Sequence, residues 1–245
     1  MGGEGRRWKT ALGVFYGMRN PFCSARIAPF ALIMLAACGG DAAKSDATPE
    51  PAAPAALVSP DPAKLASAAP ESFIIVFTTS EGDVEVLVKR SWAPKGADRL
   101  HYLAANGFFT GARFFRVLPG FVAQFGLSGH PAVDAAFEKL SFEDDPVKEK
   151  NLTGTLVFAT AGPNTRTSQL FINLADNAQL DEMGFAPVGR VVRGMDVVQL
   201  LYAGYGEGAP MGVGPDQGRI KSDGNLYLRG QFPELDSVVT ASVKP

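Results

Sequence analysis

The stretch that decides the fold is Phe114-Phe115-Arg116-Val117-Leu118-Pro119-Gly120-Phe121-Val122-Ala123-Gln124-Phe125-Gly126. Two short apolar runs flank a Pro-Gly pair, a pattern that predicts two strands joined by a turn. Arg116 and Gln124 interrupt the large apolar side chains. They are eight residues apart, but the turn between them leaves open whether they share a face. If they do, they form a donor-rich patch in an apolar groove, which suits an uncharged, carbonyl-bearing ligand such as a proline-containing peptide.

Three further stretches accompany this one: Phe142-Glu143-Asp144, residues 159–172 and residues 180–191. In order and approximate spacing, the four resemble the cyclophilin motifs F-x-R-x-x-P-G-F-x-x-Q-x-G, F-E-D, A-N-A-G-P-N-T-N-x-S-Q-F-F-I and L-D…F-G-x-V. The similarity extends from about Phe73 to Leu201. Four motifs in register are far more specific than one, and the resemblance implies a peptidyl-prolyl cis-trans isomerase.

The pattern of apolar residues predicts mostly short strands. Residues 73–79 and 83–88 form a hairpin around a Glu-Gly-Asp turn, and a closing strand covers residues 236–243. Further strands are centred near residues 114, 122, 157, 171 and 191. Helical spacing predicts one helix that begins at Pro94 and ends near Asn106, and another over residues 195–202. The glycine-rich residues 204–224 read as an extended surface loop bordering the groove, and the acidic residues 143–145 as a solvated turn.

Many short strands with two helices predict a mainly β fold, a closed eight-stranded antiparallel barrel. Side chains fill the interior of a barrel of this size, so a binding site belongs on its outside. The cyclophilin resemblance implies the same architecture, with two helices capping the barrel.

Composition excludes several kinds of function. The chain has 245 residues, of which 46% are hydrophobic and 20% charged, and its net charge is −2, so there is no basic footprint for nucleic acid. Both cysteines, Cys23 and Cys38, precede the globular part, which excludes a cysteine nucleophile or a disulfide framework there. Two histidines, His101 and His130, are too few for a multi-histidine zinc centre. We therefore expect no metal and no cofactor.

The N-terminus reads as a targeting signal. Arginines precede an apolar run over residues 27–37, which is too short for a membrane-spanning helix of about 20 residues. The run ends in Leu35-Ala36-Ala37-Cys38, which resembles a bacterial lipobox, where cleavage before the cysteine is followed by its lipidation. Glycine at position 39 favours the outer membrane over the inner. The alternatives are cleavage at an ordinary small-residue site and a twin-arginine signal at Arg6-Arg7.

These features predict three parts of the chain. Residues 1–37 form a lipoprotein-type signal whose true start is Met18, residues 38–70 a flexible Ala/Pro-rich tether, and residues 71–245 the isomerase domain. The expected location is the cell envelope, lipid-anchored through Cys38 and facing the periplasm. The expected partners are the membrane and proline-containing polypeptides, with no nucleic acid and no need for an oligomer.

The resemblance also assigns roles to single residues. Rotation about an X-Pro bond is slow because amide resonance raises a barrier of about 18–20 kcal/mol. A fixed donor near the twisted amide nitrogen lowers that barrier, and arginine holds its direction better than lysine. By resemblance, Arg116 is the catalytic donor and Gln124 holds it. The substrate-binding residues are implied to be Phe121, Val122, Ala159, Thr160, Gln169, Phe171, Leu180 and Phe185.

The chain departs from the family pattern on one wall of the groove. Val122 stands at the family's methionine, Thr160 at an asparagine and Gln179 at the tryptophan that chiefly matters for cyclosporin binding. The groove histidine has no clean counterpart, and Phe185 lies in that region instead. These changes leave substrate preference open and predict weak cyclosporin affinity.

Two other functions fit the same residues. One is a non-catalytic module that binds proline peptides, or a holdase, and the other is a structural envelope protein. Retention of Arg116 favours an isomerase over a binder, because a binder needs the pocket but not the donor. Retention of Gln124 and Gln169 beside it argues against a structural role alone. We expect a chaperone-like isomerase that acts on envelope proteins.

Overall fold

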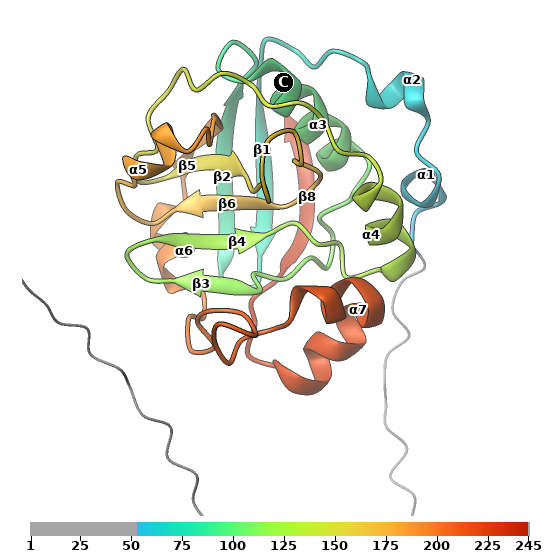
Figure 1. Ribbon diagram of the computed structural model, residues 1–245, viewed down its shortest axis with the longest axis vertical. Coiled ribbons are helices and arrows are strands. Elements are labelled where there is room, and N and C mark those ends of the chain that lie inside the picture. Colours follow the sequence, from blue (N-terminus) through green and yellow to red (C-terminus); the bar gives the residue numbers. More distant parts are fainter. Residues whose placement is uncertain (1–52, 245) are drawn as a thin grey trace, which may run out of the picture. The chain divides into compact units, whose positions relative to one another are not determined.

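The computed structural model describes residues 53–244 (Figure 1). The predicted signal and residues 38–52 of the predicted tether, including Cys38, lie outside these residues. Within the described part, no helix is both long enough and apolar enough to cross a membrane.

The framework is one eight-stranded antiparallel sheet in the order β3-β4-β6-β5-β7-β2-β1-β8. The two longest strands form the predicted N-terminal hairpin, in which Phe73 pairs with Val88 and Phe77 with Val84. The strands are β1 (Ser72–Thr79), β2 (Gly82–Lys89), β3 (Arg116–Leu118), β4 (Val122–Phe125), β5 (Thr155–Phe158), β6 (Leu170–Asn173), β7 (Pro187–Arg193) and β8 (Val238–Lys244).

The sheet curls but does not close, so the predicted closed barrel is wrong. β3 and β8 lie at opposite ends of the strand order. Backbone bonds link the segment before β3 to the start of β8 and the residues before it: the Phe114 amide donates to the Asp236 carbonyl at 2.9 Å, and the Val238 amide to the Ala112 carbonyl at 2.8 Å. β3 has only three residues, and it forms no ladder with β8. The result is an open half-barrel.

Strand alternation separates the core from the outer face. In β4, β5 and β6 the side chains of Ala123, Phe125, Leu156, Phe158, Leu170 and Ile172 point into the main core. Their neighbours along the same strands, Val122, Val157 and Phe171, form a separate apolar cluster with Leu180 on the other face. That outer cluster is the floor of the candidate site.

Helices cover the ends and edges of the sheet, and there are more than the two predicted. The predicted pair is present as α3 (Pro94–Ala105) and α6 (Met195–Leu200). Unexpected are α4 (Pro131–Glu138), α7 (Gln217–Gln231) and the short α1 (Ala55–Val58), α2 (Pro62–Leu65) and α5 (Gln179–Glu182). Non-helical backbone at Gly224 kinks α7, which breaks its periodicity in the sequence.

The N-terminus of α3 explains the acidic run before β5. The Asp145 carboxylate accepts bonds from the amides of Lys95 at 3.0 Å and Gly96 at 2.9 Å, and pairs with Arg166 at 3.0 Å. Asp145 is only 4% exposed. The expectation of a wholly solvated acidic turn is therefore wrong at this residue, which caps a helix.

A second, smaller core forms under α7. Phe115 and Leu127, which flank the β3–β4 hairpin, pack there against Ile220, Leu228 and Phe232. Figure 1 shows α7 beyond β3, on the edge of the sheet away from α3. Because Phe115 directly precedes Arg116, this core fixes the backbone that carries the predicted donor.

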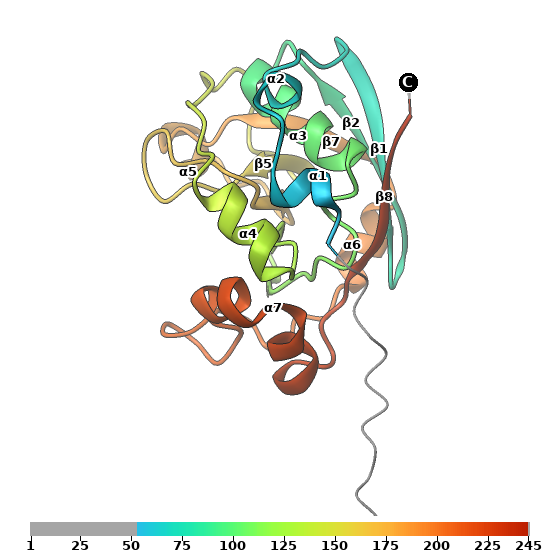
Figure 2. The same ribbon diagram turned by 90° about the vertical axis from the view of Figure 1, so that its right-hand side faces the viewer.

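Residues 53–70 belong to the folded domain, so its predicted boundary at residue 71 is too late. Leu57 is 1% exposed, and α1 and α2 lie against α4 and α3 (Figure 2). The Ala69 amide also donates to Asp98 at 2.8 Å. A short apolar anchor in an Ala/Pro-rich run gives too weak a pattern to be recognised from sequence.

Candidate active site

One row of side chains crosses four neighbouring strands on the outer face. Arg116 of β3 pairs with Gln124 of β4, Gln124 pairs with Phe171 of β6, and Phe171 pairs with Val157 of β5. Directly paired residues share a face of the sheet. The register therefore places the donor, the amide and the apolar floor in line, which the spacing in the sequence left open.

The turn between β3 and β4 sets this register. The Phe121 amide donates to the Leu118 carbonyl at 2.9 Å. Pro119 and Gly120 occupy the two central positions, and Gly120 has φ 75°, as a type II turn requires. Phe121 then leaves the turn at the rim of the outer face, with its ring centroid 5.7 Å from the Arg116 guanidinium carbon.

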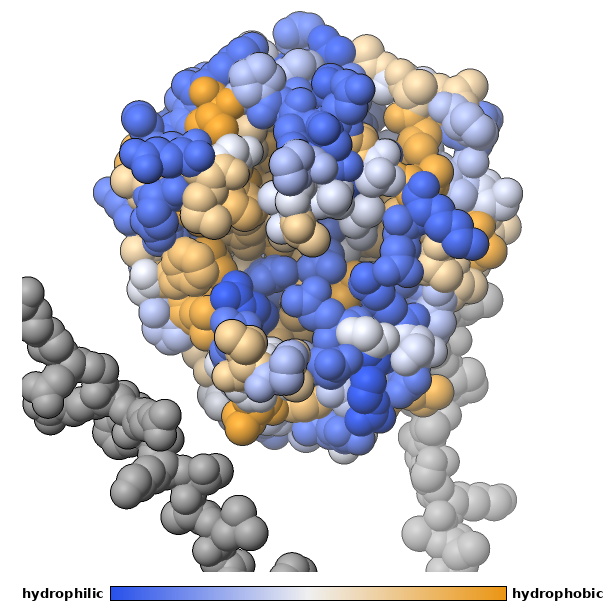
Figure 3. All heavy atoms as spheres, in the orientation of Figure 1, coloured by the Kyte–Doolittle hydropathy of each residue, from blue (hydrophilic) through white to orange (hydrophobic). Residues whose placement is uncertain are grey.

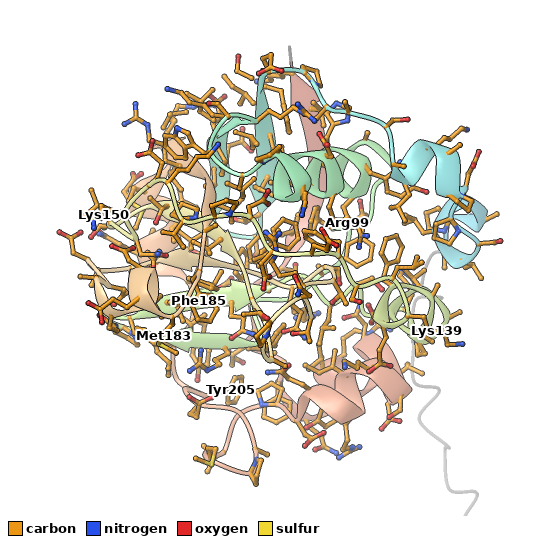
Figure 4. The ribbon with its side chains drawn as sticks, turned by 45° about the horizontal axis from the view of Figure 1, so that its top comes forward. Arg99, Lys139, Lys150, Met183, Phe185 and Tyr205 are labelled. Atoms are coloured by element: carbon orange, nitrogen blue, oxygen red, sulfur yellow. The ribbon has the colours of Figure 1, made fainter. Side chains whose placement is uncertain are left out.

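An apolar pocket of about 240 Å³ lies over this row. Every predicted catalytic and substrate-binding residue except Gln169 lines it, together with one residue that was not predicted, Met183. The Phe171 and Phe185 rings meet edge to face with centroids 5.7 Å apart. Figure 4 shows Phe185 and Met183 on the same side, near α5, and Figure 3 shows apolar and polar surface adjoining across this face.

The donor side of the site consists of Arg116, Gln124 and Gln169. The Arg116 side chain is 19% exposed, and its Nη1 donates to Oε1 of Gln124 at 3.1 Å. Nε2 of Gln124 donates in turn to Oε1 of Gln169 at 2.9 Å. Because a guanidinium only donates, Gln124 must present its oxygen to Arg116 and its nitrogen to Gln169. This order leaves the Gln169 amide nitrogen to donate to a ligand carbonyl.

An acidic residue completes the donor side. Nε of Arg116 donates to Oε1 of Glu207 at 2.6 Å, and Nη2 donates to Oε2 at 2.7 Å. The bond from Arg116 lowers the pKa of the Glu207 carboxyl, partial burial opposes it, and the Gly208 amide adds to the lowering. Glu207 therefore stays ionised at neutral pH. Sequence reasoning missed it, although it is the only charged residue in a glycine-rich run over residues 204–214.

Ala159 and Thr160 connect the pocket to a second hollow. Gln124, Ala159 and Thr160 line both, and Gln169 lines the second, whose volume is about 380 Å³. The Ala159 amide donates to the Gln169 carbonyl at 2.9 Å. The Thr160 hydroxyl bonds to the Gly162 carbonyl and to the Thr165 hydroxyl, so it supports its own loop.

A buried amide network supports the apolar side of the pocket. Asn173, fully buried, donates to Asn151 at 3.1 Å and to Thr155 at 2.8 Å. Asn177 donates to Asn173 at 2.7 Å and to the Phe121 carbonyl at 2.9 Å, and Asn151 donates to the Phe185 carbonyl at 2.8 Å. These bonds connect the β4 turn, β6 and the segment after α5. Sequence reasoning missed the network because its members are far apart along the chain.

A buried carboxyl lies beside the second hollow. Asp134 of α4 is 3% exposed and accepts bonds from the amides of Ser128 at 2.7 Å and Gly129 at 3.3 Å. Burial raises its pKa to about 6, although these bonds and the nearby His130 oppose the rise. The group titrates near neutrality, but within residues 53–244 no hydrogen bond joins it to Arg116, Gln124 or Gln169.

The sequence of this domain matches a known family. The model of the cyclophilin type peptidyl-prolyl cis-trans isomerases matches residues 74–214. The chain belongs to the cyclophilin family. Peptidyl-prolyl cis-trans isomerase A of Dickeya dadantii is 35% identical over 147 residues, 56% of this chain and 74% of that protein. A peptidyl-prolyl cis-trans isomerase of Acinetobacter baylyi is 33% identical over 142 residues, 52% of this chain and 71% of that protein.

Solved cyclophilins share the fold. A cyclophilin type peptidyl-prolyl cis-trans isomerase of Cryptosporidium parvum has a TM-score of 0.51 and 18% identity, covering 71% of this chain and 98% of its own. A second structure from that organism, in the presence of the dipeptide Ala-Pro, has a TM-score of 0.50 and 19% identity, covering 70% and 99%. The cyclophilin architecture predicted from the motifs is therefore confirmed, except that the sheet is open.

Proposed function

We propose that this cyclophilin accelerates rotation about X-Pro bonds without forming a covalent intermediate. The proline ring enters the apolar pocket formed by Phe121, Phe171, Leu180 and Phe185. A free N–H of the Arg116 guanidinium then points at the amide nitrogen, whose lone pair becomes available as the amide twists. The Gln169 amide donates to a backbone carbonyl of the substrate and holds the chain on one side of the rotating bond.

A site of this kind can supply the transition-state stabilisation that the reaction needs. An acceleration of about 10⁵-fold corresponds to roughly 7 kcal/mol of transition-state stabilisation. One preorganised donor in a site that excludes water contributes about 3–4 kcal/mol. The pocket contributes by holding the proline ring, so that only the acyl part rotates. Arg116 needs a fixed direction for this task, and its bond to Gln124 at 3.1 Å restricts that direction.

One observation carries the proposal: the guanidinium of Arg116 lines the rim of a pocket whose remaining lining is mostly apolar. The test is the rate of cis-trans isomerisation of a proline-containing peptide with the full chain and with its Arg116→Ala variant. We expect acceleration by the wild type and a loss of at least about 100-fold in kcat/KM in the variant. Equal rates for the two proteins would show that the groove only binds, as expected of a proline-peptide module or holdase.

We further propose that the protein acts in the cell envelope as a lipid-anchored monomer and assists the folding of proline-containing envelope proteins. The support is the Leu35-Ala36-Ala37-Cys38 stretch behind an apolar run. Mass spectrometry of the mature N-terminus tests it, with acyl chains on Cys38 as the expected result and an unmodified terminus as the contrary one. Cys38→Ala should move the protein from the membrane fraction to the soluble fraction.

A further inference from the structure

The ion pair between Arg116 and Glu207 has no part in the function proposed so far. Both carboxylate oxygens of Glu207 accept a bond from Arg116: Oε1 from Nε at 2.6 Å and Oε2 from Nη2 at 2.7 Å. This two-point geometry fixes both the position and the plane of the guanidinium. A single bond to Gln124 at 3.1 Å would leave the plane free to rotate.

The ion pair restricts the orientation of the Arg116 guanidinium but leaves some of its N–H groups free to bind a ligand. Arginine carries five N–H groups, and among residues 53–244 the contacts with Glu207 and Gln124 use three of them. One N–H remains on Nη1 and one on Nη2. Glu207 is not among the residues that line the apolar pocket, so its carboxylate holds Arg116 from outside and leaves the space for a proline ring open.

The loop that carries Glu207 is held by internal hydrogen bonds and by close contacts within its backbone. The Glu207 carbonyl accepts a bond from the Gly214 amide at 2.8 Å, and the Gly208 amide donates to the Glu207 carboxylate at 2.9 Å. A β-carbon at Gly212 would lie 2.3 Å from the Glu207 carbonyl oxygen, and one at Gly214 would lie 2.8 Å from it. The glycines are therefore needed because the chain folds back against residue 207.

The same loop is fixed to the smaller core. Tyr205 meets the Phe232 ring at 5.0 Å, and Phe232 packs in the cluster that contains Phe115. Figure 4 shows Tyr205 in the segment beyond β3. Arg116 and Glu207 are thus both neighbours, along the chain, of aromatic residues in one apolar cluster. The distance between guanidinium and carboxylate is set by packing and not by the ion pair alone.

We propose that Glu207 is a positioning residue for isomerisation: its carboxylate fixes the guanidinium plane of Arg116, so that the remaining Nη N–H groups face the pocket before substrate binds. This inference rests on the proposed role of Arg116 as the donor. It makes the glycine-rich residues 204–214 part of the positioning machinery, although Glu207 lies 91 positions along the chain from the donor. A donor fixed in advance stabilises the twisted amide with little cost of reorganisation.

The test compares Glu207→Gln with Glu234→Gln in the full chain. Glutamine keeps the size of the side chain and the backbone contacts, but it offers Arg116 one acceptor instead of two. Glu234 is an exposed residue in the segment after α7, so the control loses the same charge away from the groove. We expect Glu207→Gln to lower kcat about five- to twentyfold, with peptide Kd and Tm close to wild type, and Glu234→Gln to leave all three unchanged.

A second readout separates this inference from the proposed function. The Nε–Hε resonance of Arg116 in ¹H–¹⁵N spectra should exchange slowly with water in the wild type and in Glu234→Gln, and quickly in Glu207→Gln. Equal exchange in the three proteins, unchanged kcat in Glu207→Gln, or a loss explained by weaker peptide binding would overturn the positioning role. A wild type that accelerates no isomerisation would refute the proposed function, while the exchange measurement would still report whether Glu207 fixes the donor.

Discussion

The two sides of the groove are held by different forces. The donor side, defined as Arg116, Gln124 and Gln169, is fixed by an ion pair and a chain of directed hydrogen bonds. The apolar side, defined as Val122, Phe171, Leu180 and Phe185, is fixed by packing over buried amides. Direction matters for a donor and shape matters for a ring pocket. Changes on the donor side should therefore affect turnover, and changes on the apolar side should affect binding and stability.

The largest effect should follow from Arg116→Lys. Lysine keeps the charge but loses the planar fork, so its ammonium group has no plane that Glu207 and Gln124 can fix. We expect kcat to fall about 100-fold, with KM within about twofold of wild type and an unchanged Tm. Steady-state isomerisation kinetics with thermal unfolding measure all three. A variant that keeps its kcat would show that charge alone is sufficient and that direction is unimportant.

Truncation on the apolar side should show the opposite signature. Phe171 is 5% exposed, and Phe171→Ala removes the floor of the pocket. We expect KM to rise about tenfold and the free energy of unfolding to fall by about 2–4 kcal/mol. Phe171→Leu, which keeps most of the volume, should lose less than about 1.5 kcal/mol and still bind. If kcat fell in the Leu variant while KM stayed constant, the assignment of turnover to the donor side and of binding to the apolar side would be wrong.

A pH series separates stability from turnover. Because the folded pKa of Asp134 is raised to about 6 from 3.8, the folded protein binds a proton more tightly than the unfolded chain. This contribution is fully present below pH 4 and is lost as pH rises through 6. Between pH 4 and pH 7 the wild type should lose up to about 3 kcal/mol relative to Asp134→Asn.

The measurement for Asp134 is urea unfolding of both proteins across that range. Over pH 6–8 kcat should stay constant, because the lowered pKa of Glu207 keeps its ion pair with Arg116 intact. Parallel stability curves for wild type and variant would show that Asp134 does not titrate near pH 6. A kcat that followed the stability curve would link the donor side to Asp134.

The smallest effect should come from Met183, at the mouth of the pocket. Its side chain is 65% exposed, so Met183→Ala removes contact with a bound ligand and little else. We expect KM to rise less than about threefold, with kcat and Tm unchanged. A larger effect on KM than that of Phe171→Ala would show that the principal binding contact lies at the rim of the pocket and not on its floor.

Local patterns predicted much of the fold and the groove. The β1–β2 hairpin, α3, α6 and the residues of the pocket follow from alternation, helical spacing and the motifs. The open sheet did not, because closure depends on backbone pairing between β3 and β8, two strands that are far apart along the chain and that no local pattern relates. The start of the domain was also misplaced, since a single buried leucine, Leu57, anchors α1.

Long-range pairings in the site could not be predicted in the same way. Arg116 and Gln124 face each other because a three-residue connection with Gly120 at positive φ sets the register, and the spacing alone permits other registers. Glu207 reaches Arg116 from a glycine-rich loop that is fixed by contact between Tyr205 and Phe232, a residue just after α7. No short pattern encodes a contact of that kind.

In the proposed mechanism a positioned guanidinium, and not the pocket alone, accelerates rotation about the X-Pro bond. Magnetisation-exchange NMR on one proline-containing peptide measures binding and cis-trans exchange in the same sample, with wild type and with Arg116→Ala. We predict fast exchange with the wild type. With the variant, we predict a peptide that still binds within about fivefold of the wild-type Kd but exchanges at least about 100-fold more slowly. Exchange as fast with Arg116→Ala as with the wild type would show that the guanidinium is not needed for the acceleration.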